Sequence, residues 1–240
     1  MASRILYLEI KRRIIAALGQ ARWRHGQAIP SEQALANRFK VSVGTVRRAV
    51  SELVSEHVLV RRQGSGTYVA SHSPDYMLSV FYWLVDASDR KELPRMRIVS
   101  CRRGRADART ARDLRLAPGA PVIRLRAVQD VRGRPAMLDE IRIAPGPFPG
   151  LDERMLNERE GTLYGFFQER FDVTVVGVVE RLDARPASSS EARMLGLAPG
   201  SPVLRVQRTA YTYCDVPVET RIRVINTSRL RYLSLLGKRP

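Results

Sequence analysis

Basic and small residues in the stretch 30–69 are spaced like hydrogen-bond donors for a polyanion. Arg47 and Arg48 lie in an apolar-periodic segment, and Arg61 and Arg62 stand directly before the sequence Gln-Gly-Ser-Gly. Guanidinium groups donate to phosphate oxygens and to the O6 and N7 atoms of guanine. Glycine allows a backbone to approach a phosphate closely. The chemistry indicated is binding of a duplex nucleic acid.

Three helices and a hairpin are predicted to position these groups. Apolar residues recur every four positions between Leu6 and Leu18, which indicates an amphipathic first helix. Ser31 is expected to cap a second helix, and Ser42 a third whose inner face carries Val46, Val50 and Leu53. Two short strands around the glycines follow. In helix-turn-helix proteins the N-terminal end of the second helix of the motif enters the major groove.

These segments bring a family into view. LYLEIKRRI, IPSEQALANRF, VSVGTVRRAVSELV and VRRQGSGTYV follow one another without a gap over about residues 4–70. In that order they resemble the winged helix-turn-helix domain of GntR-type transcription regulators. The resemblance and the residue chemistry together predict these DNA contacts: Ser31, Gln33, Ser42, Val43, Thr45, Arg47, Arg48, Arg61, Arg62, Gly64, Gly66 and Thr67.

The predicted reading surface departs from the family at two positions. Gln33 and Val43 stand where relatives often have arginine, whereas Thr45 and Arg47 are retained. Val43 is suited to a thymine methyl group. Arg48 has two interpretations, a compensating DNA contact or a solvated helix face. We therefore expect an altered operator sequence.

A second domain follows a short connection. Residues 71–93 open with Ser, His and Pro, as a linker does, but include the aromatic cluster Phe81, Tyr82 and Trp83. Those rings either dock the segment against the next domain or line a ligand pocket. We expect a DNA-binding domain over residues 1–70, a linker and docking segment over 71–93, and an effector-binding and dimerisation domain over 94–240.

An internal repeat organises the second domain. LRLAPGAPVIRLRAVQDVRGRPAML resembles LGLAPGSPVLRVQRTAYTYCDVPVET, and each copy reads as a helix end, a Pro-Gly turn and two strands. Between the copies we expect a helix over residues 162–171, a strand over 173–182 and a helix over 188–195. Strands with interspersed helices indicate an α+β fold with an antiparallel sheet.

This half resembles the UTRA effector domain, which places the chain in the HutC branch of GntR regulators. The likeness spans roughly residues 94–235 and is carried by the paired LxLAPGxPV segments, by FPGL at 148–151 and by PVE at 217–219. It implies a chorismate-lyase-like antiparallel sheet flanked by helices, usually in a dimer. A dimer also suits a palindromic operator, because one small head reads one half-site.

The same resemblance suggests where an effector would bind. Sugar-phosphate-sensing relatives have two arginines at the positions of Ala127 and Gln129, so a phosphosugar is disfavoured. The expected pocket suits a small metabolite with amine and carboxylate groups. The predicted effector contacts are Gln129, Asp139, Arg208, Tyr211 and Glu219.

Composition and charge limit the possible functions and partners of the chain. The chain has 240 residues, a net charge of +17 and a pI near 11.0, which favours nucleic acid as the partner. Its two cysteines are far apart, so we expect no zinc site, and no cofactor motif is present. No apolar run approaches the ~20 residues that span a bilayer. We expect a cytoplasmic protein that does not act on membranes.

These observations favour a ligand-responsive transcription regulator, in this family most often a repressor, that binds double-stranded operator DNA as a homodimer. Two alternatives remain from the sequence. An enzyme is disfavoured because the three histidines lie in or beside the first domain and have no nucleophile signature beside them. A nonspecific nucleic-acid binder is permitted by charge alone, and sequence specificity would distinguish it.

Overall fold

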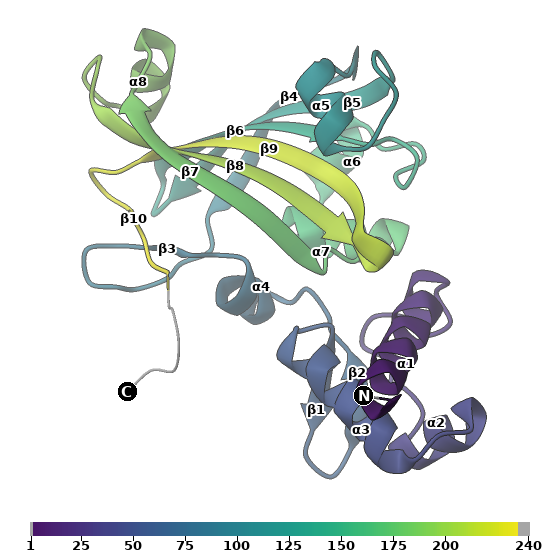
Figure 1. The fold of residues 1–240 in the computed structure, drawn as a ribbon. Helices are drawn as coiled ribbons and strands as arrows, with labels where there is room; N and C mark the ends of the chain where they lie inside the picture. Colours follow the sequence, from purple (N-terminus) through teal and green to yellow (C-terminus); the bar gives the residue numbers. More distant parts are fainter. Residues whose placement is uncertain (1, 235–240) are drawn as a thin grey trace.

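The computed structural model describes residues 2–234, which form two bodies joined by a short helical segment (Figure 1). The N-terminal body is helical with a small hairpin, and the C-terminal body is built on an antiparallel sheet. The N-terminal elements are α1 (Ala2–Gly19), α2 (Glu32–Phe39), α3 (Val43–Ser55), β1 (Leu59–Arg62) and β2 (Gly66–Val69).

Local signals set the helix-turn-helix. The Ser31 hydroxyl accepts a hydrogen bond from the backbone N–H of Ala34 at 3.2 Å, and the Ser42 hydroxyl accepts one from Thr45 at the same distance. Both predicted N-caps are therefore confirmed. Lys40 ends α2 in the left-handed conformation. The buried faces of the three helices meet in one core built from Ile10, Ile14, Leu18, Leu35, Val46, Val50 and Leu53.

The hairpin is two four-residue strands in the register Leu59↔Val69 to Arg62↔Gly66. Gly64 and Gly66 have φ values of +69° and +115°, a region that favours glycine. The tip of the hairpin therefore requires glycine at these two positions, and the sequence has glycine at both. The hairpin lies beside α3 and forms the wing of a winged helix-turn-helix (Figure 1).

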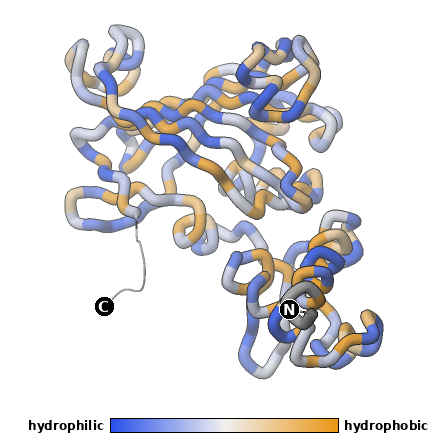
Figure 2. Tube along the Cα trace, viewed as in Figure 1, coloured by the Kyte–Doolittle hydropathy of each residue, from blue (hydrophilic) through white to orange (hydrophobic). Residues whose placement is uncertain are grey.

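A six-stranded antiparallel sheet carries the C-terminal body, with the strand order β4-β5-β6-β9-β8-β7. Its strands are β4 (Arg95–Arg105), β5 (Pro121–Val131), β6 (Arg134–Ile143), β7 (Gly177–Pro186), β8 (Pro202–Thr212) and β9 (Val216–Asn226). Hydrophobic and hydrophilic residues alternate along these strands (Figure 2), as expected where the two faces of a strand differ.

The two copies of the sequence repeat form the two halves of this sheet. One half runs β4, α5 (Ala108–Asp113), β5 and β6, and the other runs β7, α8 (Ser189–Leu195), β8 and β9. The halves meet where β6 pairs with β9, from Met137↔Ile225 to Ile143↔Glu219. The strand order is therefore symmetric about this central seam. The short 3-10 helix η1 (Tyr213–Asp215) occupies the turn of the second copy.

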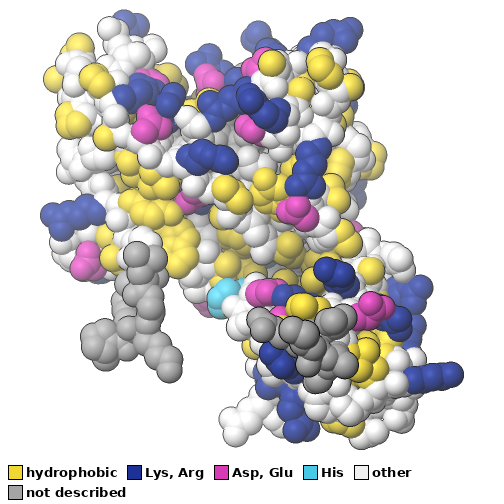
Figure 3. All heavy atoms as spheres, viewed as in Figure 1, with side chains coloured by type: hydrophobic (Ala, Val, Ile, Leu, Met, Phe, Trp, Pro, Cys, Tyr) yellow, Lys and Arg dark blue, Asp and Glu magenta, His cyan; other side chains and the backbone are white. Residues whose placement is uncertain are grey.

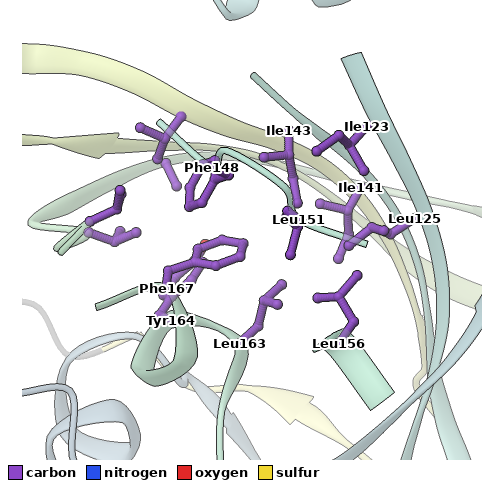
Figure 4. Close-up of a cluster of buried hydrophobic side chains, with 14 of the residues drawn as sticks. Ile123, Leu125, Ile141, Ile143, Phe148, Leu151, Leu156, Leu163, Tyr164 and Phe167 are labelled. Carbon is purple, nitrogen blue, oxygen red and sulfur yellow. The ribbon is translucent and has the colours of Figure 1, made fainter. Parts of the chain in front are cut away.

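Helices cover one face of the sheet over its main core. Figure 4 shows Ile123, Leu125, Ile141 and Ile143 of the sheet facing side chains from α6 (Glu153–Glu158), α7 (Leu163–Phe171) and the segment before α6. The predicted helix over 162–171 is α7, with Thr162 as its cap. The predicted strand over 173–182 starts later, at Gly177, because Val173 and Val175 are buried as irregular chain in this core.

The connecting segment is folded against the sheet. It forms α4 (Pro74–Val80) and β3 (Leu84–Val85), and β3 pairs with β10 (Arg231–Tyr232) near the end of the described chain. Figure 1 shows α4 between the two bodies. The bodies also touch through η1, since Tyr213 packs into the N-terminal core. Among residues 2–234, no helix is long and apolar enough to cross a membrane.

Candidate DNA interface and effector cavity

A groove between α2, α3 and the wing collects most of the predicted DNA contacts. Its walls include Ser31, Gln33, Val43, Arg47, Arg61, Arg62, Gly64, Gly66 and Thr67. The glycine-tipped wing and the N-terminal half of α3 therefore flank the same hollow. Guanidinium groups and backbone N–H groups converge there, which is the donor set that a DNA backbone and base edges require.

Glu32 lies between two of these arginines, a role that the sequence analysis did not anticipate. Its Oε2 accepts from Arg47 Nε at 2.8 Å, and its Oε1 accepts from Arg61 Nη2 at 2.9 Å. Arg61 also donates to the Ser51 hydroxyl at 3.1 Å. One carboxylate thus orients an arginine of the recognition helix and an arginine of the wing. The adjoining sequence gave no sign of this pairing, because the three residues are distant in the chain.

Three predicted contacts do not line the groove. The guanidinium carbon of Arg48 lies 4.0 Å from the centre of the Tyr7 ring on α1, which favours a packing role for Arg48 over base reading. The hydroxyls of Ser42 and Thr45 are 2.9 Å apart at the start of α3 and support the cap there. Thr45 is half-buried and Ser42 is exposed.

A small cavity lies where α4, the segment after it and α7 cover the sheet. Its volume is about 70 Å³, room for a few waters, whereas small-molecule pockets usually measure ~300–1,000 Å³. A metabolite would therefore have to move side chains to enter. The lining residues are Met77, Phe81, Tyr82, Leu93, Pro94, Met96, Gln129, Gly161, Thr162, Leu163, Tyr164, Arg208, Arg221 and Arg223.

Buried ion pairs form the polar end of this cavity. Arg223 donates from Nε and Nη2 to the two oxygens of Asp139 at 2.7 and 2.9 Å. Arg221 donates to Asp139 at 3.1 Å and, from Nε and Nη2, to Glu219 at 2.8 and 2.9 Å. Gln129 also donates to Asp139. Burial would raise the pKa of Asp139, but the charges of Arg223 and Arg221 outweigh it and lower the pKa to about 2.

A third arginine, Arg208, forms another buried ion pair at this cavity. Arg208 donates to Glu180 at 2.7 Å and to the backbone oxygen of Phe81 at 3.1 Å. The Tyr232 hydroxyl donates to the other Glu180 oxygen at 2.6 Å. Three arginines at this site are thus matched by three carboxylates. A buried ion pair is weak evidence for stability, because removing charges from water is costly. Such a cluster beside a cavity is a candidate binding site.

The predicted effector contacts divide into three groups. Gln129 and Arg208 line the cavity, whereas Asp139 and Glu219 lie beneath it and hold the arginines. Tyr211 does not line this cavity, which corrects its predicted place beside Arg208. It lines a separate hollow beside α1 and η1, because it lies three residues from Arg208 on β8 and side chains alternate between the two faces of a strand.

The sequence analysis did not predict Tyr164, Arg221 and Arg223 as cavity residues. It named Tyr82 only as part of the aromatic cluster and not as a hydrogen-bond donor. The signal for the two arginines was available, since Glu219, Arg221 and Arg223 recur at every second position of one strand and so share a face. The two interpretations of the aromatic cluster both hold in part. Phe81 and Tyr82 are buried against the sheet and also line the cavity.

The fold and these two sites define a DNA-binding regulator with a separate ligand-binding domain. Residues 6–69 match the model of bacterial regulatory proteins of the gntR family, and residues 89–231 match the UTRA domain model. The chain belongs to the GntR family of transcription regulators, in the group that carries a UTRA domain. It is a regulator and not an enzyme.

Curated relatives match the chain over most of its length. It is 29% identical over 215 residues to the "Probable fructoselysine utilization operon transcriptional repressor" of Escherichia coli K12, covering 89% of this chain and 87% of that protein. It is 31% identical over 206 residues to the HTH-type transcriptional regulator Rv0792c of Mycobacterium tuberculosis, covering 85% and 76%.

Solved structures agree with the fold. The ligand-binding domain assigned to a GntR-family regulator of Bordetella bronchiseptica is 35% identical, with a TM-score of 0.62, and covers 65% of this chain and 98% of that one. PhnF of Mycobacterium smegmatis shares the fold over 98% of this chain and 100% of its own, with a TM-score of 0.56 and 24% identity.

Proposed function

We propose that this regulator is a repressor that binds a palindromic operator as a homodimer and leaves it when a small-molecule effector enters the C-terminal cavity. Several relatives are named as repressors, among them NagR of Bacillus subtilis and PhnF of Mycobacterium smegmatis. A homodimer is supported by size, because one winged head covers a single half-site and two heads read an inverted repeat.

The DNA contacts follow from the groove. The N-terminal end of α3 enters the major groove, where Arg47 reaches a base edge and Val43 packs against a thymine methyl group. Arg61 and Arg62 neutralise phosphates beside the wing, whose glycines allow close approach. Lys and Arg side chains lie at several places on the surface of this body, with Asp and Glu side chains beside some of them (Figure 3). Glu32 fixes the direction of Arg47 before DNA arrives, which lowers the entropy lost on binding.

Release depends on α4, which contacts the effector cavity and the chain just beyond the recognition helix. Met77 and Phe81 line the cavity on one side of this segment. On the other side, the Tyr76 hydroxyl donates to the backbone oxygen of His57 at 2.7 Å, just beyond the end of α3. Since a metabolite must move side chains to enter, it displaces α4 and with it the support of the recognition helix. This double contact of α4 is the observation that carries the proposal.

Hydrogen bonds from α7 hold the connecting segment in place. Gln168 accepts from the His72 backbone N–H at 2.8 Å and donates to the Ala70 oxygen at 3.2 Å. The His72 ring lies 2.9 Å from the Val175 oxygen through Nε2 and 5.3 Å from the Tyr76 ring centre. Burial lowers the pKa of His72, and the hydrogen bonds of its ring to the backbone oxygens of Tyr164 and Val175 oppose that shift. The chain entering α4 therefore moves with α7, which forms another wall of the cavity.

Selection of bound fragments from a random duplex library tests the proposal. We expect an inverted repeat whose affinity exceeds that of unrelated DNA by ~10³-fold or more at physiological salt. Sedimentation of the complex should give two chains on one site. Selection without a preferred sequence would instead support a nonspecific nucleic-acid binder, and one chain per site would refute the homodimer.

A further inference from the structure

Three arginines lie side by side on the outer face of the sheet, the face opposite its main core. Arg124 of β5 pairs in register with Arg102 of β4 on one side and with Arg142 of β6 on the other. Leu125 and Ile141, which alternate with them, face the main core. Like charges directly opposite each other on neighbouring strands are destabilising. This arginine row, Arg102–Arg124–Arg142, is therefore unfavourable unless an anion lies over it.

The other half of the sheet shows that the fold does not require such a row. Counted from the Pro-Gly turns, Arg205 on β8 is the counterpart of Arg124. Its register partners are Asp183 on β7 and Val224 on β9. Arg205 donates to Asp183 at 2.9 Å. One copy of the repeat thus has an ion pair where the other has two like charges, so the row is a property of the first copy alone.

Neighbouring groups hold the row in place. Arg124 lies over Gly104, where a Cβ atom would come within 2.6 Å of its Nε, and it donates to the backbone oxygen of Arg105. Arg142 donates from Nη1 and Nη2 to one oxygen of Glu140, at 3.3 Å each. Two of the three guanidinium groups are therefore oriented before a partner arrives, which lowers the entropy lost on binding.

The row lies in a surface groove with an excess of positive charge. Arg103 and Arg126 line this groove together with the row, and Glu140 is the acidic residue among its lining residues. Hydrogen bonds from Thr110 are the main cause that lowers the pKa of Asp107 at the start of α5, and two arginines of the row add to that shift. With Asp107 included, five positive charges face two negative ones.

The chemistry of the groove suits the backbone of a duplex. Small-molecule sites bury most of their ligand, whereas Arg102, Arg124 and Arg126 are exposed. Protein interfaces have an apolar core enriched in aromatic residues, and single strands stack on aromatic rings. Among residues 2–234 no aromatic side chain lines the groove. A second copy of the groove would bring the same excess positive charge. Protein–DNA interfaces, in contrast, are polar and strongly positive.

We propose that the arginine row binds the phosphates of a second duplex segment while the N-terminal body holds the operator. Figure 1 shows α5 and α8 above the sheet and the N-terminal body below it. A straight duplex bound at the N-terminal body therefore lies on the other side of the sheet from the row. The regulator would link two separate stretches of DNA. This role goes beyond the repressor function and depends neither on an effector nor on a homodimer.

Capture of a second duplex tests the proposal. A fragment recovered from the random library is fixed to beads and saturated with the full chain, and a labelled duplex of unrelated sequence is added. We expect capture that weakens steeply with salt, because phosphate contacts release counterions. The double variant Arg102→Gln/Arg124→Gln should capture roughly tenfold less duplex and lower the salt slope by ~1.8, about 0.9 for each contact. Its binding to the fixed fragment should be unchanged.

Arg181→Gln/Arg205→Gln is the matched control, because it removes the same charge from the same sheet face in the other half. It should capture the second duplex as well as the unsubstituted chain does. Equal losses in the two double variants would assign the effect to net charge and overturn the proposal. No capture by the unsubstituted chain would overturn it too, as would displacement of the duplex by less polyglutamate than unrelated DNA, which would indicate an acidic protein partner.

Arg102→Asp separates loss of binding from loss of the fold. It copies the Asp183–Arg205 pair of the other half, so Tm should be unchanged or higher while capture of the second duplex is lost. Retained capture or a lower Tm in this variant would contradict the proposal. Failure here leaves the repressor function standing, because binding of the fixed fragment reports on the N-terminal body separately.

Discussion

The hydroxyl of Tyr76 on α4 lies 2.7 Å from the backbone oxygen of His57, two residues beyond the last residue of α3. The next residue, Met77, lines the effector cavity. A single turn of helix therefore contacts the end of the recognition helix and the ligand site at once. This relationship gives the coupling between the two sites a specific atom that can be removed.

Tyr76→Phe should uncouple effector binding from DNA release. The ring and its packing remain, so affinity for the operator alone and for the effector alone should stay nearly unchanged. The factor by which effector weakens operator binding, typically ~5–150-fold for such coupling, should fall toward one. Operator titrations with and without a metabolite that raises the Tm of the chain measure it. Tyr232→Phe, which loses a hydroxyl bonded to Glu180 within the C-terminal body, should keep the full factor.

Glu32→Gln should reduce discrimination between operator and unrelated DNA. Loss of the carboxylate frees Arg47 and Arg61 from their shared partner. Nonspecific affinity should rise and its salt dependence should steepen by roughly one phosphate contact, a slope change of ~0.9. Competition titrations over a range of salt concentrations test this. Glu56→Gln, whose carboxylate pairs with Lys11 on α1, serves as the control, and an unaltered specificity ratio for Glu32→Gln would contradict the orienting role.

Two adjacent arginines should behave differently. Arg47→Ala should cost about 1–3 kcal/mol of specific binding, since Arg47 contacts a base edge in our proposal. Arg48→Ala should leave specificity intact and lower the free energy of unfolding by about 0.5–1 kcal/mol, because its guanidinium packs on Tyr7. Anisotropy titrations and denaturant unfolding separate the two effects. A larger loss of specificity in Arg48→Ala than in Arg47→Ala would reverse our assignment of the α3 face.

Asp139→Asn should remove part of the acid sensitivity of the chain. The folded pKa of Asp139 is about 2, below its ordinary value of 3.8. The carboxylate therefore adds stability above pH ~4, and that stability is lost as pH falls through the folded pKa. The variant should be less stable by about 2 kcal/mol or more at pH 7. Unfolding measured from pH 7 to pH 2 should show the difference shrinking on acidification. If the difference in the free energy of unfolding stayed constant over this pH range, the negative charge of Asp139 would not be the source of the added stability.

Features that depend on neighbouring residues in the chain were predictable from the sequence. Ser31 and Ser42 cap helices because a short hydroxyl side chain can reach a backbone N–H three residues ahead, and both caps are present. The glycines of the wing have the positive φ values that their turn needs. The paired repeats became the two halves of one sheet because each copy carries its own turn and strand pattern.

Features that depend on register and on distant partners were not predictable in the same way. Tyr211 was expected to face the same cleft as Arg208, but it lies three residues further along β8 and lines a different hollow. Glu32 reaches Arg47 and Arg61 only after the helix-turn-helix and the wing have folded together. The unpaired hydroxyl of Tyr82 is visible only once every neighbour has a position.

The pairing of β6 with β9 places corresponding residues of the two repeat copies close together. Counted from Pro135 and Pro217, Asp139 and Arg221 occupy the same place in their two copies, four residues further on. They lie diagonally across the β6–β9 seam, since Arg221 pairs with Ile141 in the register, and they form an ion pair of 3.1 Å. A dimer of identical half-chains would place two acids or two bases there and would repel itself. Joining both copies in one polypeptide lets one half keep the acid while the other carries the base, so that divergence between the two halves creates the polar floor of the ligand site.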